Sequence, residues 1–372
     1  MTDVHVQTVL QFMEQHAPKR LAVEGDPIGL QIGSVKKRAS KIMITLDVLE
    51  PVVDEAVANG VDMIIAHHPL LFRPLKQLNT DTSYGRAVEK LIKHDITVFA
   101  AHTNLDVAEG GVNDMMADAL GIRDTAALAP VTEEKFKKMV VFVPHDHADA
   151  VRNALGQAGA GHIGDYSHCS FSTEGKGAFI PGSGANPYIG TKGRMERPEE
   201  ERIETIFPAS LERKVIRAML DAHPYEEAAY DIYSLDNPGR TYGLGRIGKL
   251  DQSVTLREFT ERVKEAFGVN GVRVVGDLDK TITKAAVLGG DGNKYTMHAL
   301  RQGADVYVTG DLYFHVAHDA WMEGLTMIDP GHHVEQIMKQ ALAEQLSSWL
   351  RDQKSTTEVI VSEINTDPFQ FM

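Results

Sequence analysis

Short apolar runs alternate with amphipathic stretches through the first part of the chain. Three runs, over residues 41–47, 61–66 and 96–106, have the apolar content of buried strands, and each leads into polar residues at its end. Four stretches place apolar side chains at helical spacing and predict helices over residues 4–15, 52–58, 84–94 and 112–120. The glycine-rich segment Glu24–Gly33 is predicted to be a loop. Strands that alternate with helices in this way are typical of a parallel α/β sheet.

The pattern changes at about Val131. Strands are predicted over 139–143 and 229–233, and helices over 147–155 and 211–220. Between them, Gly175–Gly193 is rich in Gly, Pro, Ser and Asn, which favours turns and a mobile hairpin. Its Gly190-Thr-Lys-Gly lacks the Gly-Lys-Ser/Thr of a phosphate-binding P-loop. We interpret residues 131–241 as a small inserted α+β domain.

After Gly243 the α/β pattern resumes. It predicts helices over 256–267, 294–302, 316–322 and 334–351, and strands that begin near residues 272, 285, 304, 326 and 358. Asn59–His67 resembles Gln302–Gly310, since each has a helix end, Gly, a small residue, Asp and then a strand. The chain is therefore predicted to have two related α/β lobes, residues 1–130 and 242–372, on either side of the insertion.

Composition narrows the class of protein. The 372 residues fit an ordinary globular protein, and the N-terminus has no basic region followed by an apolar core, so neither a membrane anchor nor a secretory signal is expected. A single cysteine, Cys169, excludes an internal disulfide and indicates a reducing cytoplasm, where we interpret it as a structural thiol. The net charge of −14 disfavours a nucleic-acid partner.

Candidate metal ligands follow three of the predicted strands. His67-His68 follows the first, the segment from His102 to Asp106 ends the second, and His332-His333 with Glu335 follows the third. In open α/β sheets, ligands bind at the carboxyl ends of the strands. Histidine with carboxylate is the ligand set of Zn, Fe or Mn. Three converging clusters would supply more ligands than one ion needs, so two divalent ions are predicted.

Each of these residues also has an ordinary interpretation. A lone His is commonly a hydrogen-bonded core or surface residue, Asp106 could cap a helix, and Glu335 would be favoured near a helix start by the dipole. Taken together, the three clusters favour a site. Two divalent ions carry four positive charges, whereas Asp106 and Glu335 carry two negative charges. The difference favours binding of a hydroxide and an anionic substrate. Paired ions lower the pKa of bound water towards about 7, and this is the chemistry of hydrolysis.

Other side chains are weaker candidates. Asp47 and Asp311 lie at further strand ends and could form hydrogen bonds to metal ligands. His315 and His318 are three residues apart on a predicted helix, where either a cleft lining or a solvated face would explain them. The histidines around Asp146 in the insertion are better explained as a polar turn.

Five motifs stand out in the sequence: Gly29–Gly33, His67–Phe72, Ala100–Asp106, Thr309–Asp311 and Gly331-His332 with Glu335. Together they resemble the family of dinuclear-metal proteins named after Ngg-interacting factor three, whose members are often called GTP cyclohydrolase I type 2 homologues. The resemblance covers about residues 1–130 and 242–372. The inserted segment, notably His223–Glu227, is similar to the PII/CutA-type, ferredoxin-like α+β domain of longer members, in particular the long Bacillus-type form.

The resemblance implies two α/β lobes around a two-metal cleft, with zinc favoured and iron or manganese as alternatives, and a homohexamer built as a trimer of dimers. Glu335 is expected to bridge the ions. It lies three residues after His332, whereas many members have four, so the metal geometry could differ, and His333 has no settled role. The implied ligands are His67, His68, Asp106, His332 and Glu335.

The implied activity is a hydrolase that uses metal-bound hydroxide on a nucleotide or another small phosphate-bearing substrate. GTP ring opening with release of formate is the reaction in the family's name. His102 or His315 would then carry protons as catalytic residues. The alternative is a non-catalytic, metal-binding hexameric scaffold or regulatory protein, because no motif in the sequence reads guanine or triphosphate.

Overall fold

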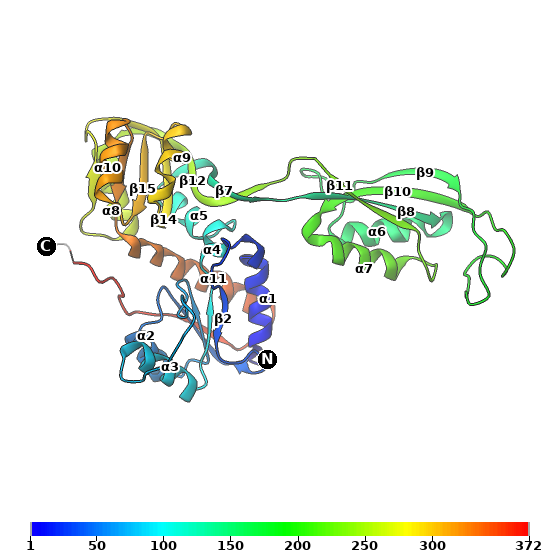
Figure 1. Ribbon diagram of the computed structural model, residues 1–372, viewed down its shortest axis with the longest axis horizontal. Coiled ribbons are helices and arrows are strands. Elements are labelled where there is room, and N and C mark those ends of the chain that lie inside the picture. The colour runs from blue at the N-terminus through cyan, green and yellow to red at the C-terminus, as the bar shows by residue number, and fades with distance from the viewer. Residues whose placement is uncertain (1, 371–372) are drawn as a thin grey trace. The chain divides into compact units, whose positions relative to one another are not determined.

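The computed structural model of the protein describes residues 2–370 (Figure 1). The chain forms two compact units. One unit comprises residues 133–241, and the other combines the segments that end at Thr132 and begin at Tyr242. None of the described helices is long and apolar enough to cross a membrane.

The first sheet of the discontinuous unit has five strands in the order β17-β4-β5-β6-β2. All neighbours are parallel except β2, which runs antiparallel to β6. Both faces are buried, as parallel strands require: Met43 and Ile64 pack with the helices α2 and α3, while Ile42 belongs to the larger core. The strands are β2 (Gly29–Ile32), β4 (Lys41–Thr45), β5 (Met63–Ala66), β6 (Thr97–Ala100) and β17 (Glu358–Val361). The helices of this part are α1 (Val6–His16), α2 (Glu50–Ala58) and α3 (Ser83–Lys93), with a small β1 (Val4–His5) and β3 (Arg38–Ala39) pair.

The second sheet of this unit has six strands in the order β13-β16-β15-β14-β12-β7. Each sequence segment therefore lends one strand to the other sheet, since β17 comes from the C-terminal segment and β7 from the N-terminal one. The strands are β7 (Ile122–Glu133), β12 (Thr241–Thr255), β13 (Arg273–Val275), β14 (Thr281–Asp291), β15 (Val306–Gly310) and β16 (Thr326–Asp329). The helices are α8 (Leu256–Phe267), α9 (Thr296–Arg301) and α10 (Phe314–Met322).

The two halves repeat one local arrangement. Asp62 precedes β5, and its Oδ2 accepts hydrogen bonds from the backbone N–H of Ser40 (2.6 Å) and of Lys41 (3.2 Å) at the start of β4. Asp305 precedes β15, and its Oδ2 accepts the equivalent bonds from Thr283 (2.8 Å) and Lys284 (2.9 Å) at the start of β14. The sequence similarity between these two segments thus corresponds to a shared way of fixing neighbouring parallel strands.

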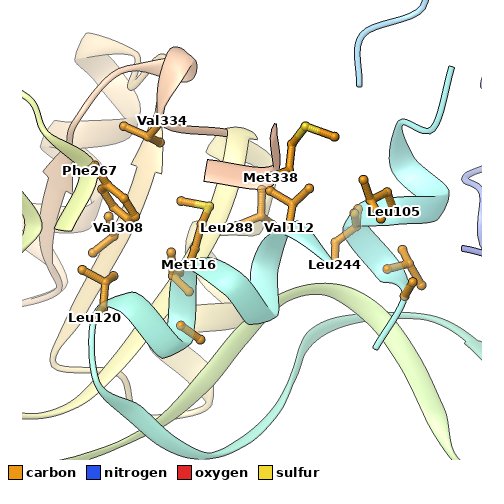
Figure 2. Packing of buried hydrophobic residues seen from close by; sticks show 14 of the residues in the cluster. Leu105, Val112, Met116, Leu120, Leu244, Phe267, Leu288, Val308, Val334 and Met338 are labelled. Atoms are coloured by element: carbon orange, nitrogen blue, oxygen red, sulfur yellow. The ribbon is translucent and has the colours of Figure 1, made fainter. Parts of the chain in front are cut away.

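A single apolar core includes residues of both sheets, and Figure 2 shows part of it. It is built around α4 (Thr103–Val107), α5 (Val112–Ala119) and α11 (Ile337–Asp352). Met116 and Leu120 project from the α5 region towards the second sheet, and Leu105 of α4 and Met338 of α11 lie in the same cluster. Burying side chains of this size contributes about 1.5–3 kcal/mol each, so the elements that follow β6 and β16 are firmly positioned.

The unit of residues 133–241 has the element order β-α-β-β-α-β of ferredoxin-like domains. Its four antiparallel strands lie in the order β11-β8-β10-β9, and both helices pack on one face of the sheet (Figure 1). Met139, Ile203 and Val215 are among the residues that fill the space between them. The elements are β8 (Phe136–Pro144), α6 (Ala148–Ala158), β9 (Phe171–Lys176), β10 (Glu199–Pro208), α7 (Glu212–Ala222) and β11 (Tyr230–Leu235).

The α/β class predicted from the sequence is confirmed, and helix 256–267 coincides with α8. Other expectations were wrong. Glu24–Gly33 is not all loop, because Gly29–Ile32 forms the edge strand β2. The strand predicted over 96–106 ends at Ala100, and a short helix follows. The strands β7, β9, β10 and β12 were missed because glycines and charged residues interrupt their patterns, although buried Ile203, Thr205 and Phe207 of β10 do alternate.

Candidate metal centre

Three strand ends of the discontinuous unit deliver the candidate ligands. His67 and His68 follow β5, and their backbone N–H groups donate to the carbonyls of Thr45 and Leu46, which prolongs the pairing with the neighbouring strand segment. Asp106 lies on α4, just after β6. His332 and Glu335 lie on the 3₁₀ helix η5 (His332–Gln336), which follows β16.

The 3₁₀ conformation of η5 explains the short spacing between His332 and Glu335. A 3₁₀ helix has three residues per turn, so side chains three positions apart are eclipsed. His332 Nε2 lies 3.3 Å from Glu335 Oε2. The spacing of three residues therefore still brings both side chains to one place.

Glu335 is at the centre of the cluster. Its Oε2 lies 3.1 Å from His68 Nε2 and 3.7 Å from His67 Nε2. His67 Nε2 is in turn 3.6 Å from Asp106 Oδ1. Three groups of possible ligands have their donor atoms within 4.8 Å of one another: His68 with His332 and Glu335, His67 with Asp106 and Glu335, and His67 with His68 and His102. The first two groups share Glu335.

Each histidine of the cluster is oriented through its Nδ1. His68 Nδ1 donates to Asp47 (2.7 Å), and His332 Nδ1 donates to Asp311 (2.6 Å). The Nδ1 of His67 donates to the carbonyl of Ala101 (2.8 Å). These bonds leave Nε2 free for the site, which is the arrangement that carboxylates and carbonyls impose on metal-binding histidines.

His102 is held in the same way by a residue that sequence reasoning missed. Its Nδ1 lies 2.9 Å from Asp26 Oδ1, and the other oxygen of Asp26 accepts from the backbone N–H of Thr103 (3.0 Å). Asp26 lies in the loop before β2, three residues ahead of the first residue of that strand. No feature of its local sequence distinguishes it from a turn aspartate beside a proline.

Two buried polar atoms at the centre suit a cation. His67 Nε2 and Asp106 Oδ1 are buried and have no hydrogen-bond partner among the described residues. A buried polar group without a partner costs about 1–3 kcal/mol, so a cation between these atoms would remove a substantial penalty. The residues present therefore fit a divalent metal with nitrogen and oxygen donors.

The close contacts among these charged side chains shift their pKa values. For Glu335, burial raises the pKa, but contacts with His332, His67 and His68 outweigh burial and bring the pKa well below its ordinary value. Burial raises the pKa of Asp106. The contact with Glu335 raises the pKa of His332 to about 9, and for His68 the carboxylates of Asp47 and Glu335 outweigh burial and raise the pKa to about 10.

Other predicted residues lie elsewhere. His315 is exposed on α10 and belongs to none of the three groups, so its role in proton transfer stays a prediction. The ring of His318, on the same helix, contacts that of Phe314 in a tilted arrangement. His333 is outside the groups as well, and burial lowers its pKa. His147 belongs to the inserted unit.

Fold and cluster together define a mixed α/β protein with histidine, aspartate and glutamate groups that could hold metal. Residues 4–368 match the model of the family described as Duf34/NIF3 (NGG1p interacting factor 3), and the chain belongs to this family.

Relatives of similar length are known. The chain is 57% identical over 366 residues to a protein of Halalkalibacterium halodurans named GTP cyclohydrolase 1 type 2 homolog, with 98% of each chain covered. It is 56% identical over 369 residues to the Bacillus subtilis protein of the same name, with 99% of each covered. The crystal structure of a Bacillus cereus protein related to NIF3 superposes with a TM-score of 0.96 at 55% identity and covers 100% of both chains.

Proposed function

We propose that the protein is a hydrolase that depends on two divalent metal ions. One ion would be held by His67, Asp106 and Glu335, and the other by His68, His332 and Glu335. The observation that carries this proposal is the overlap of two three-ligand groups at Glu335, with orphaned atoms of His67 and Asp106 beside it.

The ions would supply Lewis acidity and an activated water, and zinc is favoured by the mixed imidazole and carboxylate donors, with iron or manganese as alternatives. The remaining work falls to the protein. Asp47 and Asp311 orient His68 and His332 by accepting from their Nδ1 atoms. Asp106 and Glu335 would provide two carboxylate ligands in a buried setting.

His102 is the proposed proton carrier. Its ring centroid lies 5.3 Å from that of His67 and 5.7 Å from that of His68, and its side chain is 21% exposed. It therefore reaches both the cluster and solvent. Asp26 fixes its Nδ1, so that Nε2 exchanges the proton.

The substrate is proposed to be a nucleotide or another small phosphate-bearing molecule. A hollow of about 530 Å³ is formed by the segment that follows the histidine pair, and it includes Phe72, Arg73 and Lys76. The Phe72 ring lies 6.4 Å from that of His102. An aromatic face with two cations beside the cluster suits a base with phosphates. GTP is the first candidate, because it appears in the name of the relatives.

The proposal is tested by measuring metal content and then turnover of GTP and a panel of phosphoesters. Asp106→Asn should lose metal and activity, while the exposed Asp118→Asn on the neighbouring helix should keep both. Formate release that requires Asp106 would support the cyclohydrolase reaction. Full metal occupancy without turnover of any substrate would contradict the hydrolase and leave the metal-binding scaffold.

We also propose that the chain assembles as a homohexamer, a trimer of dimers. Supporting this, Tyr313, Phe314, Trp321 and Met322 on and beside α10 are 57%, 69%, 58% and 80% exposed, and exposed aromatic clusters of this kind mark interaction sites. The β-α-β-β-α-β order supports a PII/CutA-like identity for the insertion. Light scattering should give the mass of six chains for the wild type. The variant Trp321→Glu should give the mass of fewer than six chains. A monomeric wild type would contradict the proposed homohexamer.

A further inference from the structure

The inserted unit contains a cavity of about 640 Å³ that the proposed hydrolase does not use. It lies between the sheet, the connection from β9 to β10 and the segment that follows α7. This connection is the long loop beyond the ends of β9 and β10 in Figure 1. Cavities of 300–1,000 Å³ with mainly apolar walls are typical of small-molecule sites.

Three aromatic rings form part of the wall. Phe179 and Tyr188 come from the connection, and Tyr225 comes from the segment after α7. The Tyr225 ring centroid lies 6.0 Å from that of Phe179 and 6.3 Å from that of Tyr188. Tyr188 is 53% exposed, so its face is available to a ligand. Clustered aromatic faces bind cations through the ring quadrupole.

The polar groups of the wall favour positive charge in the ligand. Four carboxylates line the cavity, those of Glu174, Glu200, Glu226 and Glu227. Glu200 is only 9% exposed, and its Oε1 accepts from the Tyr225 hydroxyl (3.0 Å). Within the described residues, none of the four carboxylates forms a salt bridge to a basic side chain.

Each of the two basic residues of the wall pairs with a carboxylate that lies outside it. Arg202 pairs with Glu204 (2.5 Å) and Lys176 pairs with Glu199 (3.4 Å), and neither glutamate lines the cavity. An anionic ligand would therefore be repelled by four carboxylates, and the two basic side chains near it already have carboxylate partners. A cationic ligand would meet aromatic faces and carboxylates.

One hydrogen bond connects two parts of the cavity wall. The Asn186 backbone N–H, in the connection, donates to Glu226 Oε1 (2.8 Å), beyond α7. This bond holds the loop that carries Tyr188 over the wall that carries Tyr225. From these contacts we infer that the inserted unit binds a small organic cation, an amine or quaternary ammonium with an apolar body, between Tyr188, Tyr225 and Glu200.

The test is calorimetric titration of the full-length protein with three ligands of similar size. These are benzyltrimethylammonium, neutral benzyl alcohol and anionic phenylacetate. The cation should bind saturably, one per chain, and about tenfold or more tighter than the neutral compound, because a cation over aromatic faces gains about 1–2 kcal/mol. Equal or tighter binding of phenylacetate or benzyl alcohol, or no binding of the cation, would overturn the inference.

Variants locate the site. Glu200→Gln and Tyr188→Ala should each weaken binding of benzyltrimethylammonium by roughly tenfold, as loss of one charged or cation–π contact does. The controls Asp165→Asn and Tyr166→Ala change exposed residues of the same unit that do not line the cavity, and they should bind like the wild type. Because the Tyr188 side chain is largely exposed, its replacement tests the site without threatening the fold. Unchanged binding in both cavity variants would place the cation elsewhere and refute the assignment.

Discussion

Asp106 and Glu335 occupy equivalent positions in the two halves of the discontinuous unit. Asp106 lies nine residues after Thr97, the first residue of β6, and Glu335 lies nine residues after Thr326, the first residue of β16. Both starting residues donate a backbone N–H to the aspartate that precedes the neighbouring strand, Asp62 or Asp305. The two carboxylates therefore reach the same cluster from related directions, and His67 Nε2 lies 3.6 and 3.7 Å from them.

This equivalence does not make the two carboxylates interchangeable. Glu335 belongs to both overlapping ligand groups, whereas Asp106 belongs to one. We expect Glu335→Gln to lose both ions and Asp106→Asn to lose mainly one, as measured by elemental analysis after gel filtration. Equal losses in the two variants would contradict a bridging role for Glu335.

The carboxylates that accept hydrogen bonds from the histidine Nδ1 atoms should strengthen metal binding. Asp47→Asn and Asp311→Asn remove the acceptors of His68 and His332 Nδ1, and such changes weaken metal binding by about 10–100-fold. The measurement is competition with a chelator of known affinity, with circular dichroism to verify folding. Asp54→Asn, an exposed change on α2, is the matched control. Affinities within a factor of two of the control would show that the two aspartates have no part in ligand orientation.

Metal binding should release protons and tighten as pH rises. The pKa values of His68, about 10, and His332, about 9, lie above neutrality, so both are protonated in the metal-free protein at pH 7. A metal ion must displace these protons. Calorimetry in buffers of different ionisation enthalpy should show more than one proton released per chain, and His68→Ala should release fewer. Proton uptake on binding would contradict this.

The same histidines should make the metal-free protein less stable in alkali. Their folded pKa values exceed the ordinary value of 6.5, so their contribution is fully present below about pH 6.5 and is lost as pH rises through 9 to 10. Denaturant melts of the discontinuous unit, followed by its two tryptophans, Trp321 and Trp349, should therefore show a falling free energy of unfolding over this range. A flat profile would contradict the charged contacts.

The inserted unit should respond to pH in the opposite sense. Burial lowers the pKa of His223, whose Nδ1 accepts from the backbone N–H of Tyr225 (3.1 Å) while Nε2 donates to the Phe142 carbonyl (2.9 Å). The neutral ring is the folded form, so its stabilisation is complete above about pH 6.5 and is lost as pH falls through the lowered pKa.

Hydrogen exchange along β8 and α7, corrected for intrinsic rates, should accordingly lose protection in the wild type as pH falls below about 6.5. His223→Gln should remove most of this pH dependence at the expense of stability at pH 7, while the exposed His162→Gln should keep it. Protection that rises on acidification would refute the neutral assignment.

The sequence by itself determined the α/β class and most helices, because apolar periodicity in segments such as 256–267 reports a buried face directly. It also pointed to the residues that now cluster. All of them follow apolar runs: His67, His68 and Asp106 come after β5 and β6 of one sheet, and His332 and Glu335 come after β16 of the other.

Only the tertiary structure decided how these residues meet. The exchange of β7 and β17 between sheets depends on pairing between distant segments, which leaves no local signal. The support of His102 by Asp26, 76 residues away, is equally non-local. The convergence of Asp106 and Glu335 required the core between α4, α5 and α11, whose packing fixes the two segments relative to each other. Periodicity reports which face of an element is buried, but not which partner buries it.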